Sequence, residues 1–239
     1  RIDPTQARII LIEGSPTVLA HLPPDLSASA QRQLEALGVQ VRNSIHVKVI
    51  RRGEVELANG EIIRAGNILW AAGISATPLT RKLGVELDKA GRVKVNSDLS
   101  VPGHPEVFAV GDLALVLQEN SKPVPGVSPA AMQMGKHVAR IVEAEIDSDA
   151  KSAARPAFTY WDKGTMATIG RSAAVAWIGR FKFSGWFAWL AWLFIHLIFL
   201  VGFRNRIAVL FQWAYSYLSY KRSARIITYL PPDKSRPQP

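Results

Sequence analysis

An acidic side chain directly after a short apolar run is the feature of this sequence best placed to bind a ligand. Residues 107–110 (V-F-A-V) lie between Pro105 and Gly111, a pattern typical of a strand buried on both faces. Gly111 allows a tight turn and a close approach of a ligand to the backbone. Asp112 would then lie just beyond the carboxyl end of the strand, where open α/β sheets bind their ligands. An acid that only begins a loop is the alternative.

A second acid follows the first apolar run of the chain. Residues 7–12 (A-R-I-I-L-I) predict a core strand, and Glu13 comes directly after it. In nicotinamide-binding βαβ units an acid at this place accepts hydrogen bonds from the ribose hydroxyls, and a glycine-rich loop precedes it by about 20 residues. That loop is not in the chain, so a solvated loop acid remains the alternative reading of Glu13.

Two further stretches have the composition of ligand-binding backbone. Residues 68–72 (I-L-W-A-A) predict a strand closed by Gly73, and Ala72 and Gly73 would expose bare backbone to a nucleotide. Otherwise Gly73 only ends the strand. A helix is predicted to begin at Ser128-Pro129, and its positively polarised amino terminus would suit an electron-rich ring near Asp112.

The elements that must position these residues alternate between strand and helix patterns. A helix is predicted over 27–37, and Asn59-Gly60 is a strong two-residue hairpin signal. The remaining predicted elements are strands at 39–41, 45–50, 55–57, 62–63 and 93–95, a crossover over 77–105, and a strand over 158–169 with a turn at 162–164. The sequence therefore predicts an α/β protein.

Composition limits the chemistry and the partners. The 239 residues include no cysteine, which excludes disulfides, thiolate metal sites and cysteine redox chemistry within the chain. The net charge of +10 is concentrated after residue 169, where ten Lys and Arg face one acid. These basic residues flank an apolar segment, so anionic lipid is the expected partner and nucleic acid is not.

That apolar segment covers residues 185–203, which are 19 residues without a charge and with one imidazole, His196. Its length matches the roughly 20 residues that cross a bilayer. Residues 207–218 carry an apolar stripe at helical spacing and suit a helix lying in the membrane plane. Two arrangements remain open: a spanning helix followed by an interfacial helix, or a helical hairpin in one leaflet. A buried helix at a dimer interface is the soluble alternative.

The motifs together resemble the type II, non-proton-pumping NADH:quinone oxidoreductases. The matching stretches are I-I-L-I-E-G-S-P-T-V-L at 9–19, I-L-W-A-A-G-I at 68–74, V-P-G-H-P-E-V-F-A-V-G-D at 101–112, V-P-G-V-S-P-A-A-M-Q-M-G at 124–135, D-K-G-T-M-A-T-I-G-R at 162–171 and G-F-R-N-R at 202–206. The W-A-A-G and G-D elements also occur in flavoprotein disulfide reductases, so the D-K-G turn and the C-terminal tail are the specific part.

The resemblance implies a role for particular residues. The expected cofactor-binding residues are Glu13 for the NADH ribose, Ala72 and Gly73 along the nicotinamide path, Gly111 and Asp112 for FAD, Pro129, Ala130 and Gln133 beside the flavin and the quinone entrance, and Lys163 approaching the flavin from the C-terminal region. Many members of the family carry A-Q-x-A-x-Q where this chain has S-P-A-A-M-Q. Pro129 therefore replaces a glutamine that would bond the quinone.

The resemblance also implies an organisation and an activity. Residues 1–80 would be the C-terminal part of an NADH-binding domain, 81–156 that of a FAD-binding domain, and 157–239 a helical membrane-anchoring region. The fold implied by the resemblance is an incomplete two-dinucleotide-binding, Rossmann-like flavoprotein fold. NADH would reduce FAD and leave before a membrane quinone takes two electrons. Because both glycine-rich loops would lie upstream, we expect a piece of a longer protein that is inactive alone, on the cytoplasmic face of a bacterial-type inner membrane.

Two other functions, and the oligomeric state, remain open from the sequence. A sulfide:quinone reductase would share the fold and tail but needs catalytic cysteines, which would have to lie upstream. A non-catalytic membrane adaptor with a degenerate nucleotide-binding fold predicts decay of the ligand positions, yet Glu13, Asp112 and Lys163 are present. For the oligomeric state, a homodimer is one of the open alternatives.

Overall fold

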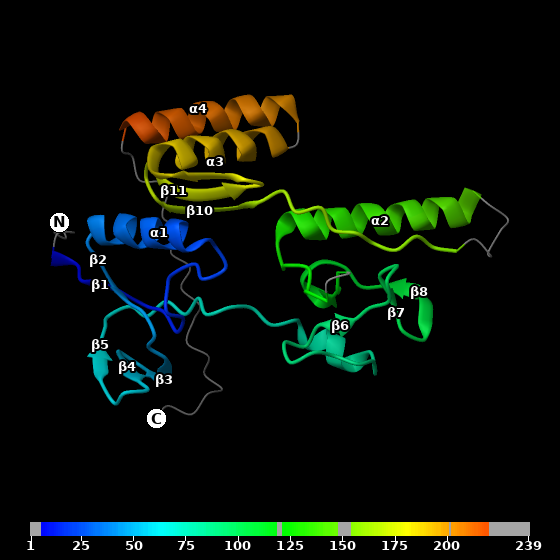
Figure 1. Ribbon diagram of the computed structural model, residues 1–239, viewed down its shortest axis with the longest axis horizontal. Coiled ribbons are helices and arrows are strands. Elements are labelled where there is room, and N and C mark those ends of the chain that lie inside the picture. Colours follow the sequence, from blue (N-terminus) through cyan, green and yellow to red (C-terminus); the bar gives the residue numbers. More distant parts are fainter. Residues whose placement is uncertain (1–5, 119–120, 148–153, 201, 220–239) are drawn as a thin grey trace, which may run out of the picture.

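The structure is a computed structural model that describes residues 6–118, 121–147, 154–200 and 202–219, and it consists of two lobes (Figure 1). The first lobe combines residues 6–64 with residues 165–219, and the second lobe comprises residues 78–160. Two extended stretches, around residues 65–77 and 161–164, join the lobes. The ends of the described chain thus belong to one lobe, and its middle forms the other.

The first lobe starts with a βαβ unit. Strand β1 (Ile9–Ile12) and strand β2 (Val39–Arg42) pair in parallel, and helix α1 (Pro24–Ala36) connects them. The predicted helix is confirmed, although it begins three residues earlier, because prolines are tolerated in the first turn. Its buried face carries Leu26, Ser27 and Ala30.

A three-stranded antiparallel sheet follows, made of β3 (Val47–Arg51), β4 (Glu54–Leu57) and β5 (Ile62–Arg64). The predicted hairpin is confirmed, but its loop has three residues, Ala58 to Gly60, because the Leu57 N–H donates to the Glu61 carbonyl oxygen at 2.9 Å. Gly60 has φ +88°, and the Asn59 side chain accepts a hydrogen bond from the Glu61 N–H at 3.0 Å. Both features are local, which is why the sequence predicts this hairpin well.

Two predicted strands are corrected by the structure. Residues 68–72 form no strand, and Leu69 in their middle is 94% exposed. These residues run between the lobes, where no described strand lies beside them to accept backbone hydrogen bonds. Strand β8 (His104–Phe108) is not a buried parallel strand but pairs antiparallel with β7 (Ser100–Val101), because a turn through Gly103, at φ +81°, folds it back.

The second lobe is built around helix α2 (Ser128–Asp147). Beneath it lie the short helix η2 (Pro78–Lys82), the parallel pair β6 (Val93–Lys94) and β9 (Ala114–Leu115), and the short helix η3 (Gly111–Leu113). The buried core of this lobe consists of Val93, Leu99, Val101, Ala109, Ala114, Val116, Val124, Ala130, Met134 and Tyr160.

The C-terminal sheet lies between helices of the first lobe. Strands β10 (Thr165–Gly170), β11 (Ala173–Ile178) and β12 (Phe181–Ser184) are antiparallel. Along β11, Val175 joins the cluster around α1, whereas Ala174 and Ala176 pack against Ala188 on the other face. This alternation follows from the two-residue period of a strand. The predicted strand over 158–169 is confirmed only from Thr165 onward.

Two helices cover the outer face of this sheet. Helix α3 (Gly185–Phe199) packs on β11, and helix α4 (Phe203–Ser219) returns beside it as a hairpin (Figure 1). Trp192 stacks on Trp213 with 5.9 Å between the ring centroids, and the ring centroids of Trp189 and Tyr217 are 5.2 Å apart. These aromatic contacts hold the two helices together along their length.

The apolar segment 185–203 does not form one continuous helix in the described residues. Helix α3 ends at Phe199, Leu200 is extended, and Gly202 has φ +84°, which breaks the helix. The Arg206 guanidinium donates to the Leu200 carbonyl oxygen at 2.8 Å and closes the turn. Within the described ranges, no helix has both the length and the apolar character required to cross a membrane. Helices α3 and α4 thus form a helical hairpin.

An ion-pair network closes the second lobe. Arg155 donates to Asp98 at 3.1 Å, to Glu145 at 2.6 Å and to the Pro105 carbonyl oxygen at 2.7 Å, and its guanidinium lies 5.0 Å from the Phe108 ring centroid. Burial alone would raise the pKa of Asp98, but hydrogen bonds from Ser100 and Arg155 outweigh it and lower that pKa. The network joins the segment after α2 to the β7–β8 hairpin.

We expect Asp98→Asn to destabilise the protein by about 1–3 kcal/mol at pH 7, because it removes a charged partner of Arg155. The folded pKa lies below the unfolded value of about 3.9, so this stabilisation is complete above pH 3.9 and is lost as pH falls through the folded pKa. Denaturant unfolding between pH 7 and pH 3 should therefore show a flatter acid limb for the variant. The exposed acid Glu106, changed to Gln, is the control; equal acid limbs in wild type and Asp98→Asn would contradict the assignment.

Candidate functional site

A hollow of about 230 Å³ lies where the linker between the lobes meets the amino terminus of α2. Its walls come from the linker, from η3, from the loop before α2 and from the first two turns of α2. The lining residues are Ile74, Ser75, Ala76, Ala90, Arg92, Gly111, Asp112, Ala114, Val124, Pro125, Gly126, Val127, Ala130, Ala131 and Met134. Its volume is below the roughly 300–1,000 Å³ of complete ligand pockets. The hollow formed by the described residues is therefore smaller than a complete ligand pocket.

Gly111 and Asp112 form one wall of this hollow. Gly111 has φ +68°, and its N–H lies 3.1 Å from the Met134 sulfur. A Cβ at Gly111 would lie 3.3 Å from the Ala131 methyl carbon, and one at Gly126 would lie 3.2 Å from Asp112 Oδ1. Gly126 thus leaves space for the exposed Asp112 carboxylate, and Gly111 leaves space for the Ala131 methyl group.

The amino terminus of α2 differs from the sequence-based expectation. The N–H groups of Ala130 and Ala131 both donate to the Val127 carbonyl oxygen, at 3.0 and 3.1 Å, and Pro129 has no N–H. Fewer backbone donors are therefore directed at a ligand than the motif predicted, although the helix dipole still favours an electron-rich group there. Ala130 lines the hollow as expected, whereas Pro129 is exposed outside it.

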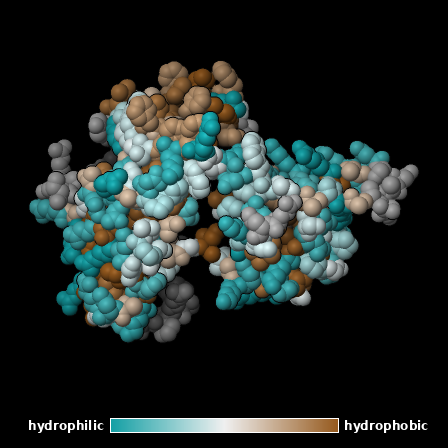
Figure 2. All heavy atoms as spheres, viewed as in Figure 1, coloured by the Kyte–Doolittle hydropathy of each residue, from teal (hydrophilic) through white to brown (hydrophobic). Residues whose placement is uncertain are grey.

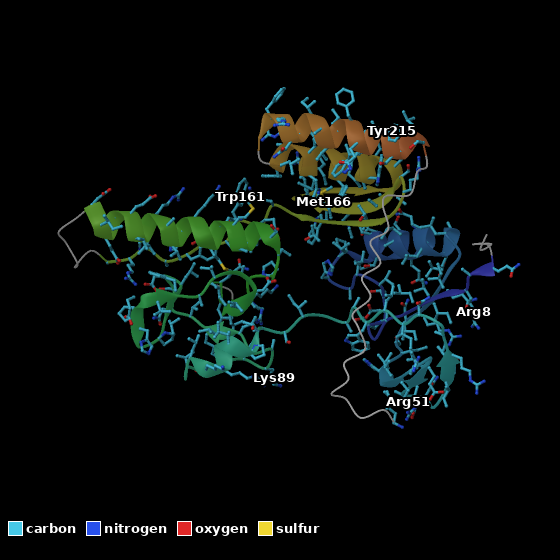
Figure 3. All side chains as sticks on the ribbon, turned by 180° about the vertical axis from the view of Figure 1, so that it is seen from behind. Arg8, Arg51, Lys89, Trp161, Met166 and Tyr215 are labelled. Carbon is cyan, nitrogen blue, oxygen red and sulfur yellow. The ribbon has the colours of Figure 1, made fainter. Side chains whose placement is uncertain are left out.

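Gln133 is engaged in the protein rather than in the hollow. Its amide nitrogen donates to the Trp161 carbonyl oxygen and its amide oxygen accepts from the Trp161 N–H, both at 3.0 Å. Figure 3 shows Trp161 beside the amino-terminal end of α2, on the side facing the C-terminal sheet. The side chain predicted to contact flavin or quinone thus holds the connection between the lobes.

Lys163 lies in the D-K-G turn that follows Trp161. Its ammonium is 5.3 Å from the Trp161 ring centroid and 5.1 Å from that of Phe199. Asp162 accepts the Gly164 N–H at 2.8 Å, and Gly164 has φ +98° with no space for a Cβ beside Trp177. Trp161 and Phe199 were not predicted from the sequence, because only the fold brings residue 199 to this turn.

The residues predicted to bind the nicotinamide nucleotide do not line the hollow. One of them lies in the first lobe and two lie in the linker. Glu13 ends β1 beside β2, is partly buried, and accepts the Ser15 N–H at 2.8 Å. Ala72 and Gly73 are exposed in the linker, just before the residues that line the hollow. Gly73 has φ +98° and open space around it. Of the predicted residues, the structure therefore places Gly111, Asp112 and Ala130 together in the hollow. The other predicted residues lie outside it.

Comparison with known proteins identifies the class that this fold and site define. Residues 4–135 match the pyridine nucleotide-disulphide oxidoreductase family, and residues 162–221 match the NDH2 C-terminal domain. Because the first match covers more than half of the chain, the chain belongs to the pyridine nucleotide-disulphide oxidoreductase family. The Rossmann-like α/β fold predicted from the motifs is confirmed.

Within that family, the predicted resemblance to type II NADH:quinone oxidoreductases is also confirmed. Two such proteins of Mycobacterium tuberculosis (strain ATCC 25618 / H37Rv), NdhA and Ndh, are each 42% identical to this chain over 95% of its length. The chain spans 49% of NdhA and 50% of Ndh, about half their length. The structure of NDH2 from Plasmodium falciparum in complex with NADH has a TM-score of 0.78 at 16% identity, covering 87% of this chain and 58% of that one. This last likeness shows the fold.

Proposed function

We propose that this chain is the C-terminal portion of an NADH:quinone oxidoreductase that reduces a membrane quinone without pumping protons. The observation that carries the proposal is the exposed Asp112 carboxylate, which lines the hollow at the amino terminus of α2 and has Gly126 beside it. FAD, when bound, supplies two-electron chemistry, and the protein supplies binding and orientation. Asp112 would accept a hydrogen bond from a ribityl hydroxyl, and Ala130 would leave space beside the ring.

The first lobe would bind NADH. Glu13 ends a parallel strand, where its carboxylate would accept hydrogen bonds from the adenosine ribose hydroxyls. Ala72 and Gly73 would line the nicotinamide path, with Pro129, Gln133 and Lys163 near the quinone entrance. On this proposal the domain divisions near residues 80 and 156 separate the NADH half, the FAD half and the C-terminal region.

The hairpin of α3 and α4 would hold the protein on a membrane. Figure 2 shows hydrophobic residues gathered over these two helices. Their exposed large apolar side chains are Trp186, Phe187, Leu190, Phe194, Ile198, Phe199, Phe203, Ile207, Leu210, Phe211, Tyr215, Tyr217 and Leu218. Soluble monomers rarely expose so continuous an apolar surface. The exposed basic residues Arg180, Arg204 and Arg206 around it favour anionic lipid over a second copy of the chain.

Glu13→Gln in the full-length protein should lower the preference for NADH over NADPH about 5- to 30-fold. The carboxylate repels the 2′-phosphate of NADPH, and its hydrogen bonds to the ribose hydroxyls are stronger than those of an amide. The measurement is the ratio of kcat/KM for the two nucleotides with a quinone acceptor. Glu143→Gln, a change of an exposed acid on α2 in the other lobe, is the control. An unchanged ratio would make Glu13 a loop acid, and a wild-type protein without NADH-dependent quinone reduction would refute the function.

A further inference from the structure

The ammonium of Lys163 lies between two aromatic rings that come from distant parts of the chain. Trp161 precedes it in the turn, and Phe199 is the last residue of α3. Both centroids are within the roughly 6 Å at which a cation is attracted to an aromatic face. Lys163 is thus placed by one ring from its own turn and one from the helical hairpin.

One side of this arrangement is fixed to the second lobe. The two Gln133 hydrogen bonds hold the Trp161 backbone on α2, and the neighbouring residues Ala130, Ala131 and Met134 line the hollow. The turn itself is fixed by Gly164, because a Cβ there would lie 2.3 Å from the Trp177 carbonyl oxygen. Trp161 therefore has a defined place relative to the hollow.

The other side depends on the hairpin. Phe199 is 59% exposed and ends α3 at the point where the chain turns toward α4. The turn is closed by Arg206, which donates to Leu200 next to Phe199. The position of the Phe199 ring therefore follows the position of the hairpin, whose exposed face is the one proposed to lie on lipid.

We propose that Phe199 is a positioning residue, whose ring holds the Lys163 ammonium against Trp161 and so fixes the positive charge that Lys163 presents to a quinone. The inference rests on the proposed function and specifies how the membrane-contacting part reaches the site. Without the Phe199 ring, the long lysine side chain regains its freedom, and Lys163 no longer presents a fixed positive charge to an acceptor.

The test compares Phe199→Leu, Phe199→Tyr and Phe194→Leu in the full-length, FAD-loaded protein on phosphatidylglycerol–phosphatidylcholine vesicles. Phe194 is the matched control, since it is 60% exposed on the same helix, five residues earlier. Leucine keeps both sites apolar, and a vesicle flotation assay verifies equal membrane binding. The first readout, independent of activity, is the acetylation rate of Lys163, measured by mass spectrometry of its peptide.

We expect Phe199→Leu to raise the acetylation rate of Lys163 about three- to tenfold over that of Phe194→Leu, because one of the two rings that face the amine is lost and the amine becomes more accessible to the reagent. Relative to Phe194→Leu, its KM for a short-chain quinone should also rise. This fold-change should exceed the fold-change in its rate with a water-soluble acceptor. Phe199→Tyr keeps an aromatic face and should restore both values.

Equal Lys163 acetylation in the two leucine variants would overturn the contact. A labelling difference with equal quinone KM values would overturn the positioning role. A labelling difference in a protein without any NADH-dependent quinone reduction would refute the proposed function, and with it the role of Phe199 in turnover, while the contact itself would stand.

Discussion

Detergent, but not high salt, is expected to release the full-length protein from membranes. The hairpin exposes large apolar side chains along both helices, and burying each one fully contributes roughly 1.5–3 kcal/mol. Each Arg or Lys near the headgroups contributes on the order of 1 kcal/mol, and salt screens that part alone. The apolar contribution is therefore several times the ionic one. Membrane flotation in high salt and in mild detergent measures the difference.

The structure also decides where the hairpin should be removed for this test. A truncation before Gly179 would remove β12, which pairs with β11, and the ion pair between Lys182 and Asp25 at 2.9 Å. A truncation after Ser184 keeps all three strands, although Ala174 and Ala176 lose their cover on α3.

Point variants avoid that loss of cover. Phe187 and Phe211 are 71% and 69% exposed, so changing both to Ser should weaken membrane binding with little effect on folding. Ile146, 76% exposed on α2, is the control position for an equivalent Ile146→Ser change. If high salt alone strips the intact protein from membranes, the hairpin is covered by protein and the lipid assignment is wrong.

Asp112→Ala is expected to weaken FAD retention about 10- to 150-fold in the full-length protein. The change removes a charge-assisted hydrogen bond to the cofactor, worth roughly 1.5–3 kcal/mol. FAD released on dilution or gel filtration, quantified by its absorbance, measures the effect. Glu106→Ala, an exposed acid on β8, provides the control.

Gly126→Ala tests the same geometry without removing the carboxylate. The added methyl group would lie 3.2 Å from Asp112 Oδ1, so the exposed carboxylate should shift by a few tenths of an ångström and FAD retention should fall by less than in Asp112→Ala. Normal flavin content in both Asp112→Ala and Gly126→Ala would show that this wall of the hollow does not contact FAD.

The sequence by itself determined the features that depend on near neighbours in the chain. The Asn59-Gly60 hairpin, helix α1 and the start of α2 at Ser128-Pro129 follow from turn chemistry, helical spacing and proline placement. The place of Asp112 directly after Gly111 is likewise a local property. The motifs also predicted the family correctly, because ligand-contacting backbone demands particular residue types at fixed spacing.

Only the tertiary structure decided which distant residues meet. Residues 68–72 have a strand composition, but a strand needs a neighbouring strand to bond its backbone, and none lies there among the described residues. The run over 185–203 has the length of a span, but the break at Gly202 and the stacking of Trp192 on Trp213 make it part of a hairpin.

The surroundings of Gln133 and Lys163 were decided in the same way. Gln133 bonds a backbone 28 residues away, and Lys163 meets a ring at position 199. Composition and spacing report the local backbone preference of each residue. The partner that an exposed amide or ammonium finds depends instead on how α2, the C-terminal sheet and the hairpin pack together.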